Sequence, residues 1–147
     1  MTLTRPVTVM LERRTRQTFV VELGRLVAQV EIFSEGFVLA AKAGVRPEAL
    51  FEVIQSSLAR SALIDFKAPF VFKGDFTPYF ALKLMHKDLE LAMENAYAQN
   101  VPMPVAVAVK EVYGAAKAQG KGDLDCAAVI TFLEEVVGVK VRVTVEG

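Results

Sequence analysis

The sequence predicts an all-α fold, a helical bundle around one long central helix. Two observations lead to this prediction. Residues 18–43 contain no proline and are followed by a glycine, which is typical of one uninterrupted helix and its end. Residues 81–99 also lack proline, and their apolar residues recur at spacings of three and four.

The first predicted helix, residues 18–43, is expected to lie at the centre of the bundle. Its apolar stripe consists of Val20, Leu23, Val27, Val30 and Phe37. A helix of about 25 residues is roughly 37 Å long at about 1.5 Å per residue. That length suits a helix against which the others pack.

A second helix is expected to open at Pro47, because proline suits the first helical turn. Its inner face is predicted to carry Leu50, Phe51, Ile54 and Leu58. A short helical piece over residues 62–66 should follow. Pro69 and the pair Gly74-Asp75 predict the break after it.

The helix over residues 81–99 is expected to bury its apolar stripe and to be capped by Asn100. The stripe consists of Leu82, Met85, Leu89, Ala92 and Ala96. Pro102 and Pro104 predict the start of a further helix to about Gln119. Gly120 and Gly122 should end it.

The last predicted helix covers residues 126–137, with Asp123 as its N-cap. Residues 139–145 then alternate apolar and polar side chains, a β-strand pattern. We expect a short exposed extension there, or an edge strand.

Composition excludes several classes of protein. The 147 residues suit one domain, with 17 basic and 17 acidic side chains, and this balance argues weakly against a nucleic-acid binder. Arg13, Arg14 and Arg16 form the one basic run, interpreted as a solvated tail rather than a phosphate-binding arm. No apolar window is long enough to span a membrane, and the start lacks a signal peptide's apolar region, so a cytoplasmic location is expected.

The apolar share of 53% is high for a single domain, which indicates either an oily core or a face that another subunit covers. Cys126 is the only cysteine, so neither a disulfide nor a zinc cluster is expected, and its apolar neighbours predict a buried helix position.

His86, the only histidine, is interpreted as a surface or half-buried imidazole. The carboxylate pair Glu90 and Glu94 is interpreted as a solvated helix face, Glu134-Glu135 is a further possible pair, and no metal site is predicted.

The segment from Phe76 to Ala92, FTPYFALKLMHKDLELA, resembles the GF-x-x-x-L-x-x-KD-L-x-x-A signature of the β-hydroxyacid dehydrogenases. Weaker matches in the right order are SEGFVLAAKAGV from Ser34, Met103-Pro-Val-Ala and KGDLD ending at Asp125. The resemblance covers about residues 27–141. It implies the family's helical C-terminal domain, similar to that of 6-phosphogluconate dehydrogenase, which closes over substrate and cofactor.

The resemblance also implies roles for particular residues. Phe80 and Asp88 match positions that meet the substrate, and Lys87 matches a lysine that reaches the NAD or NADP cofactor. Spacing alone favours a core position for Phe80 and a solvated face for Lys87 with Asp88, and the resemblance reverses this preference for their positions. Ser57, Arg60 and Ser61 are weaker candidates, because they precede the family's short helix. Tyr79 replaces the usual glycine, which would narrow the pocket mouth.

The chain departs from the family in its first part. The family's catalytic lysine falls on Phe19 or, with one deletion, on Val20, and neither side chain transfers protons. No G-x-G-x-x-G fingerprint of a dinucleotide-binding domain is present. Hence no catalytic residue is assigned.

The expected organisation is an unrelated extension over residues 1–17, a substrate-closing and dimerisation domain over 18–138, and a tail over 139–147. We expect such a domain to be inactive alone and to form homodimers through its long helix. An alternative is a non-catalytic helical interaction module derived from the same domain. The abrupt start of the similarity indicates a truncated or frameshifted reading frame, or a gene fragment with a new N-terminus.

Overall fold

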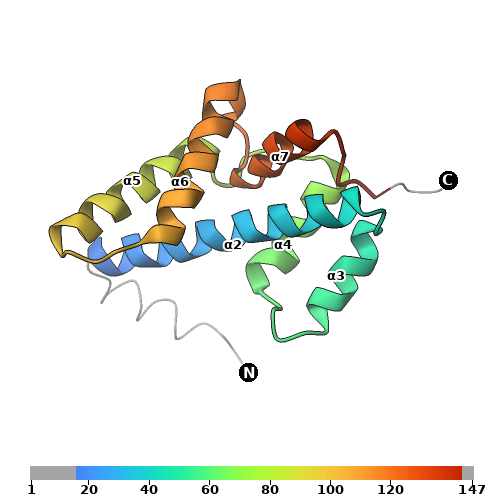
Figure 1. Ribbon diagram of the computed structural model, residues 1–147, viewed down its shortest axis with the longest axis horizontal. Helices are drawn as coiled ribbons and strands as arrows, with labels where there is room; N and C mark the ends of the chain where they lie inside the picture. Colours follow the sequence, from blue (N-terminus) through green and yellow to red (C-terminus); the bar gives the residue numbers. More distant parts are fainter. Residues whose placement is uncertain (1–15, 144–147) are drawn as a thin grey trace.

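The computed structural model describes residues 16–143, with side chains described from residue 21, and its regular elements are helices (Figure 1). They are α2 (Arg16–Lys42), α3 (Pro47–Gln55), α4 (Ala62–Lys73), α5 (Leu82–Ala98), α6 (Pro104–Ala116) and α7 (Val129–Val137). A π-helical turn (Lys117–Lys121) and a 3-10 turn (Cys126–Ala128) lie between α6 and α7. Residues 16–143 contain no strand, only one isolated bridge between Ala81 and Asp125. The predicted all-α class is confirmed.

Helix α2 is the central helix, as predicted. It has 27 residues, which corresponds to about 40 Å, and it runs along the molecule in Figure 1. Every other α-helix packs against it. Of its predicted stripe, Leu23, Val27, Val30 and Phe37 are buried, and the side chain of Val20 lies outside the described part.

The core is closed by aromatic contacts between α2, α3 and α4. The ring centroid of Phe37 lies 4.5 Å from that of Phe33 and 5.4 Å from that of Phe72. The ring centroid of Phe51 lies 5.6 Å from that of Phe72. Tilted and edge-on rings at these distances pack favourably. All five apolar residues predicted to face inward from α5 are buried. In the part of the chain that the structure describes, no helix is long and apolar enough to cross a membrane.

Helix α4 corrects the prediction of a short piece ending before Pro69. The helix continues to Lys73, with Pro69 inside it and a left-handed Gly74 (φ 70°) at its end. An interior proline costs about 3 kcal/mol. The exposed ring of Pro69 is tolerated because Val71 and Phe72 beyond it are buried in the core.

Helix α3 corrects the prediction for Leu58, which is fully exposed rather than facing inward. The helix ends at Gln55, so Leu58 lies outside its register. Leu50, Phe51 and Ile54 pack against the core as predicted, although each is only partly buried. At the end of α5, Asn100 follows the cap residue Gln99 and takes a positive φ of 54°.

The cap of the last helical segment is Asp125, not Asp123. The Asp125 side chain accepts a hydrogen bond from the Ala127 N–H at 3.0 Å, whereas Asp123 is exposed and pairs with Lys83. The preceding helix α6 ends at Ala116, earlier than predicted, and the π-helical turn carries Gly120 at φ 83°.

The residues after α7 were wrongly predicted to be exposed or an edge strand. Val141 is fully buried, and the Val143 N–H donates to the Phe72 carbonyl at 3.1 Å. Glu134, buried on α7, accepts hydrogen bonds from the Val141 N–H at 2.8 Å and from Arg142 at 2.7 Å. The alternating apolar and polar residues therefore distinguish the inner side of this segment from its outer side. The buried Glu134 carboxylate holds the segment in place, and no neighbouring strand among the described residues does so.

Residues 1–15, including Arg13 and Arg14 of the basic run, lie outside the described residues.

Candidate functional site

The loop before α5 carries the first predicted site residue, Phe80, and is held by one carboxylate. Asp125 accepts hydrogen bonds from the N–H groups of Tyr79 at 3.0 Å and Phe80 at 3.3 Å. The Cys126 N–H in turn donates to the Phe80 carbonyl at 2.8 Å. Both backbone polar groups of Phe80 are thus fixed, and its partly buried ring packs against the core.

A buried ion pair stands behind this loop. The Lys67 ammonium lies 2.7 and 2.8 Å from the two carboxylate oxygens of Asp125, and both residues are buried. Burial alone would raise the pKa of Asp125, but the bonds from Lys67 and from backbone N–H groups outweigh it, so this pKa is lowered. The pair links α4 to the segment before α7 and holds the Phe80 loop between them. Sequence reasoning missed it, although a lysine within the apolar run of residues 66–72 was a signal.

Lys87 and Asp88 lie on α5, one to two turns beyond its start. Lys87 is exposed, and among the described residues its ammonium forms no ion pair. Asp88 is half-buried, and burial raises the pKa of its carboxyl while the neighbouring Lys87 opposes the rise. Phe80 precedes this helix by two residues. The three predicted residues therefore share one helix start, but they do not line the cavities described next.

The weaker candidates Arg60 and Ser61 line a hollow of about 450 Å³ between α2, α3 and α4. The Ser61 hydroxyl donates to the Gln29 side chain at 2.8 Å. Arg60 pairs with Asp65 at 2.9 Å, and this hydrogen bond lowers the pKa of the Asp65 carboxyl. Ser57 caps its own turn instead, accepting the Ala59 N–H at 3.1 Å.

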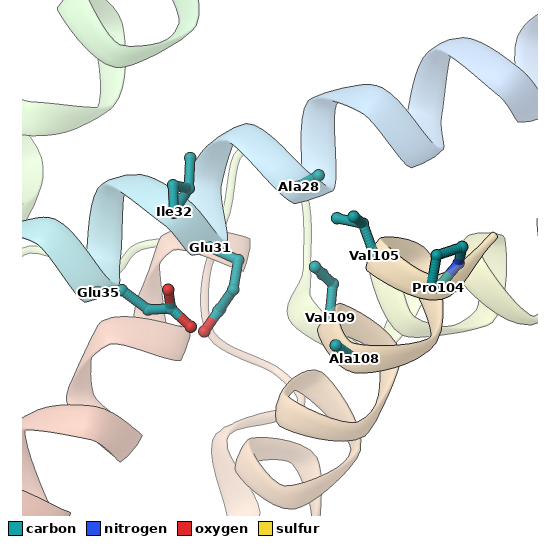
Figure 2. A pocket seen from close by; sticks show the side chains of 8 residues that line it. All are labelled: Ala28, Glu31, Ile32, Glu35, Pro104, Val105, Ala108 and Val109. Carbon is teal, nitrogen blue, oxygen red and sulfur yellow. The ribbon is translucent and has the colours of Figure 1, made fainter.

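A second groove, of about 380 Å³, lies between α2 and α6 (Figure 2). Its lining is apolar except for two carboxylates: Ala28, Glu31, Ile32, Glu35, Pro104, Val105, Ala108 and Val109. Glu31 is only 3% exposed, and neither carboxylate oxygen has a hydrogen-bond partner among the described residues. Burial, reinforced by the charge of Glu35, raises the pKa of Glu31 to about 7. Sequence reasoning missed this acid, although it follows Val30 of the apolar stripe directly.

The family's catalytic position lies at the other end of the bundle from Phe80. Val21, next to Phe19 and Val20 in sequence, lines a hollow with Ala96 and Gln99, near the C-terminal end of α5. Phe80 lies at the N-terminal end of this 17-residue helix, about 25 Å away along its axis. Within this chain, α2 therefore does not bring these positions together with Phe80.

The remaining reactive groups lie outside these cavities. Cys126 is buried, and burial first, then the nearby Asp125 carboxylate, raises the pKa of its thiol to about 12. His86 is half-buried, with Glu90 3.7 Å away, as predicted. Glu135 pairs with Lys121 at 2.9 Å, whereas Glu134 accepts hydrogen bonds from the Val141 N–H and Arg142, so the two carboxylates have separate partners. Residues 16–143 hold no cluster of three or more potential metal ligands.

Comparison with known proteins matches residues 26–133 to the family described as the NAD-binding domain of NADP-dependent 3-hydroxyisobutyrate dehydrogenase. The chain belongs to this family. The match covers most of the described helices, from α2 into α7, and includes Phe80, Lys87 and Asp88.

Three relatives show how far the family likeness extends. The chain is 38% identical to 2-(hydroxymethyl)glutarate dehydrogenase of Eubacterium barkeri over 74% of this chain and 36% of that protein. It is 40% identical to the cytokine-like nuclear factor N-PAC of Aedes aegypti over 65% of this chain and 17% of that protein. The solved 3-hydroxyisobutyrate dehydrogenase of Mycobacterium tuberculosis superposes with a TM-score of 0.71 and 32% identity, over 78% of this chain and 41% of that one. The chain thus spans well under half the length of these members of the 3-hydroxyisobutyrate dehydrogenase family.

Proposed function

We propose that this chain is the C-terminal domain of a β-hydroxyacid dehydrogenase, which closes over substrate and cofactor and does not turn over alone. The observation that carries the proposal is the start of α5. There the loop that carries Phe80 is held by hydrogen bonds to Asp125, and Lys87 and Asp88 follow on the helix in the spacing of the family signature. The proposed reaction interconverts a small β-hydroxyacid and its semialdehyde.

The residues present fit a nicotinamide cofactor, NAD or NADP, in part. When bound, such a cofactor exchanges hydride with the substrate carbon. The exposed ammonium of Lys87 suits its negative phosphates, and the half-buried Asp88 suits a substrate hydroxyl. The ring of Phe80, fixed through both backbone groups, would form an apolar wall that orients the substrate.

Proton transfer is the part of the reaction that these residues do not supply. Phe19 and Val20, at the family's lysine position, have no titratable group. A dinucleotide-binding domain carrying that lysine must therefore come from another polypeptide, or from a longer form of this one.

A chimera tests the proposal. The N-terminal half of a related dehydrogenase replaces residues 1–25 of this chain and ends at the position aligned with residue 25, so it includes its lysine and keeps the register of α2. The junction lies where the family match begins, at residue 26. We expect the chain alone to show no NADH- or NADPH-linked turnover and the chimera to gain it. Lys87→Met should raise the chimera's KM for the cofactor at least about tenfold. Lys83→Met is the matched control, because Lys83 is exposed one turn away and pairs with Asp123. Turnover by the chain alone, or equal effects of the two substitutions, would refute the assignment.

A second candidate function is a homodimeric interaction module without catalysis. Three apolar side chains on α2 favour it, since Val21, Ile32 and Leu39 are 64%, 67% and 71% exposed. We propose that the chain forms homodimers through this helix in either case. Sedimentation equilibrium over a wide concentration range measures the mass, and a monomer throughout would exclude the homodimer.

A further inference from the structure

The exposed side of α2 carries a heptad pattern. Its residues, called the α2 seam below, are Val21, Arg25, Ala28, Ile32, Glu35 and Leu39, which alternate spacings of four and three. Five of the six are exposed, and Ala28 is partly buried. Buried residues of α2 lie between them in sequence. Alternating spacings of four and three are the pattern by which helices pair side by side.

The charges on the seam are arranged symmetrically about residue 30. Arg25 lies five residues before this point and Glu35 five residues after it. Ala28 and Ile32 flank the centre, and Val21 and Leu39 lie at the ends. When a second copy of the helix packs antiparallel, Arg25 of each copy therefore faces Glu35 of the other. In the same arrangement the small Ala28 of each copy faces the large Ile32 of the other.

The groove beside the seam is lined by two acidic side chains, the buried Glu31 and the exposed Glu35. Neither carboxylate oxygen of Glu31 has a hydrogen bond to any residue that the structure describes, and the carboxylates of Glu31 and Glu35 turn toward one another (Figure 2). An arginine side chain offers five donors in a planar fork, enough to bridge two carboxylates. Arg25 of each copy pairs with its own Glu22 at 2.6 Å, one turn before it. This pair is exposed and contributes little stability, so the guanidinium can exchange it for the carboxylates of the second copy.

We propose that the α2 seams of two copies pack antiparallel, with Val21 opposite Leu39, Ala28 opposite Ile32, and Arg25 of each copy on the Glu35–Glu31 pair of the other. Exposed Val105 of α6, which lines the groove with Ile32, widens the apolar contact. The arrangement rests on the proposed homodimer, not on the proposed chemistry.

The alternative orientation is disfavoured by the same charges. In a parallel pair in register, Arg25 would face Arg25 and Glu35 would face Glu35 of the second copy, and like charges across an interface oppose association. An unrelated apolar partner would bury the exposed carboxylate of Glu35 without compensation. A second copy is the occupant that supplies both the apolar side chains and the guanidinium.

Charge reversal tests this register. Arg25→Glu gives a seam with two acidic residues, and Glu35→Arg gives one with two basic residues. Each variant alone should dimerise at least about tenfold more weakly than the native chain, because two like-charge contacts replace two ion pairs per dimer. Mixed in equal amounts, the two variants should form a heterodimer of about native affinity. Sedimentation equilibrium measures the dissociation constants, and circular dichroism confirms that each variant is folded.

Glu94→Arg is the control, because Glu94 is exposed on α5, away from the seam, and its reversal changes the net charge equally. Its dimer should be unaffected. A native dimer that the seam variants do not weaken would overturn the register and leave the homodimer standing. A native chain that stays monomeric would overturn both. Failure of the mixture to form heterodimers after the single variants weaken the dimer would overturn the antiparallel pairing.

Discussion

Replacing Glu31 by glutamine should make the free energy of unfolding less dependent on pH. Glu31 is 3% exposed and has no hydrogen-bond partner in the part of the chain that the structure describes, so the folded chain resists ionising it. Its pKa is raised to about 7, against an ordinary value of 4.5. Below both values the carboxyl is protonated in the folded and the unfolded chain. As pH rises from about 4.5 to about 7, the unfolded chain releases the proton first, and folding loses stability.

The magnitude follows from the two pKa values. The folded and unfolded pKa values differ by about 2.5, and each pKa unit corresponds to about 1.4 kcal/mol. The native chain therefore loses roughly 3 kcal/mol of its free energy of unfolding above pH 7. A domain of 147 residues has a free energy of unfolding of roughly 7–20 kcal/mol. Glu31→Gln keeps the shape and cannot ionise. The variant should therefore be more stable than the native chain by up to about 3 kcal/mol near pH 8 and about equal to it near pH 4.5.

Urea unfolding followed by circular dichroism over this pH range measures the effect. Dilute protein is used, so that a second copy does not supply Arg25. Glu35→Gln is the matched control, since Glu35 is exposed one turn away and its charge helps to raise the pKa of Glu31. That variant should shift the loss of stability to lower pH without removing it. A stability difference between Glu31→Gln and the native chain that stays constant with pH would refute the reasoning.

Three further predictions concern other buried groups. Lys67→Met should lower the free energy of unfolding by about 3–5 kcal/mol in urea titrations, because it leaves the buried Asp125 without its counter-charge; a loss below about 1 kcal/mol would contradict a buried ion pair. Glu134→Gln should increase amide hydrogen exchange at Val141, because the Glu134 carboxylate accepts that N–H at 2.8 Å and its charge holds the segment. Unchanged exchange would show that apolar packing alone holds the segment in place. Cys126, whose pKa burial raises to about 12, should react with Ellman's reagent only after unfolding, and rapid reaction of the native chain would disprove its burial.

Helix positions could be predicted from the sequence because local patterns determine them. The proline-free run of α2, its glycine stop, and the apolar spacing of α5 each depend on neighbouring residues alone. The family could also be predicted from the sequence, because the signature around Lys87 and Asp88 is contiguous. The family match over residues 26–133 confirms this prediction. The roles of Phe80, Lys87 and Asp88 stay predictions.

The errors arose where tertiary packing outweighs a local signal. Pro69 is a helix breaker by local rules, yet burial of the residues after it carries α4 onward. The alternating residues after α7 have a strand pattern, yet the Val141 N–H donates to the buried Glu134 carboxylate and the Val143 N–H to the Phe72 carbonyl, not to a neighbouring strand.

The sequence by itself determined the all-α class, the long central helix and the family of this protein, because each depends on residue patterns along the chain. Only the tertiary structure decided that Lys67 meets Asp125 from 58 positions away, and that Glu31 lies buried beside Glu35 with no hydrogen-bond partner among the described residues. The reason is physical: the pKa of a group and the use of a surface depend on what surrounds a side chain in space. Residues far apart in sequence supply those surroundings.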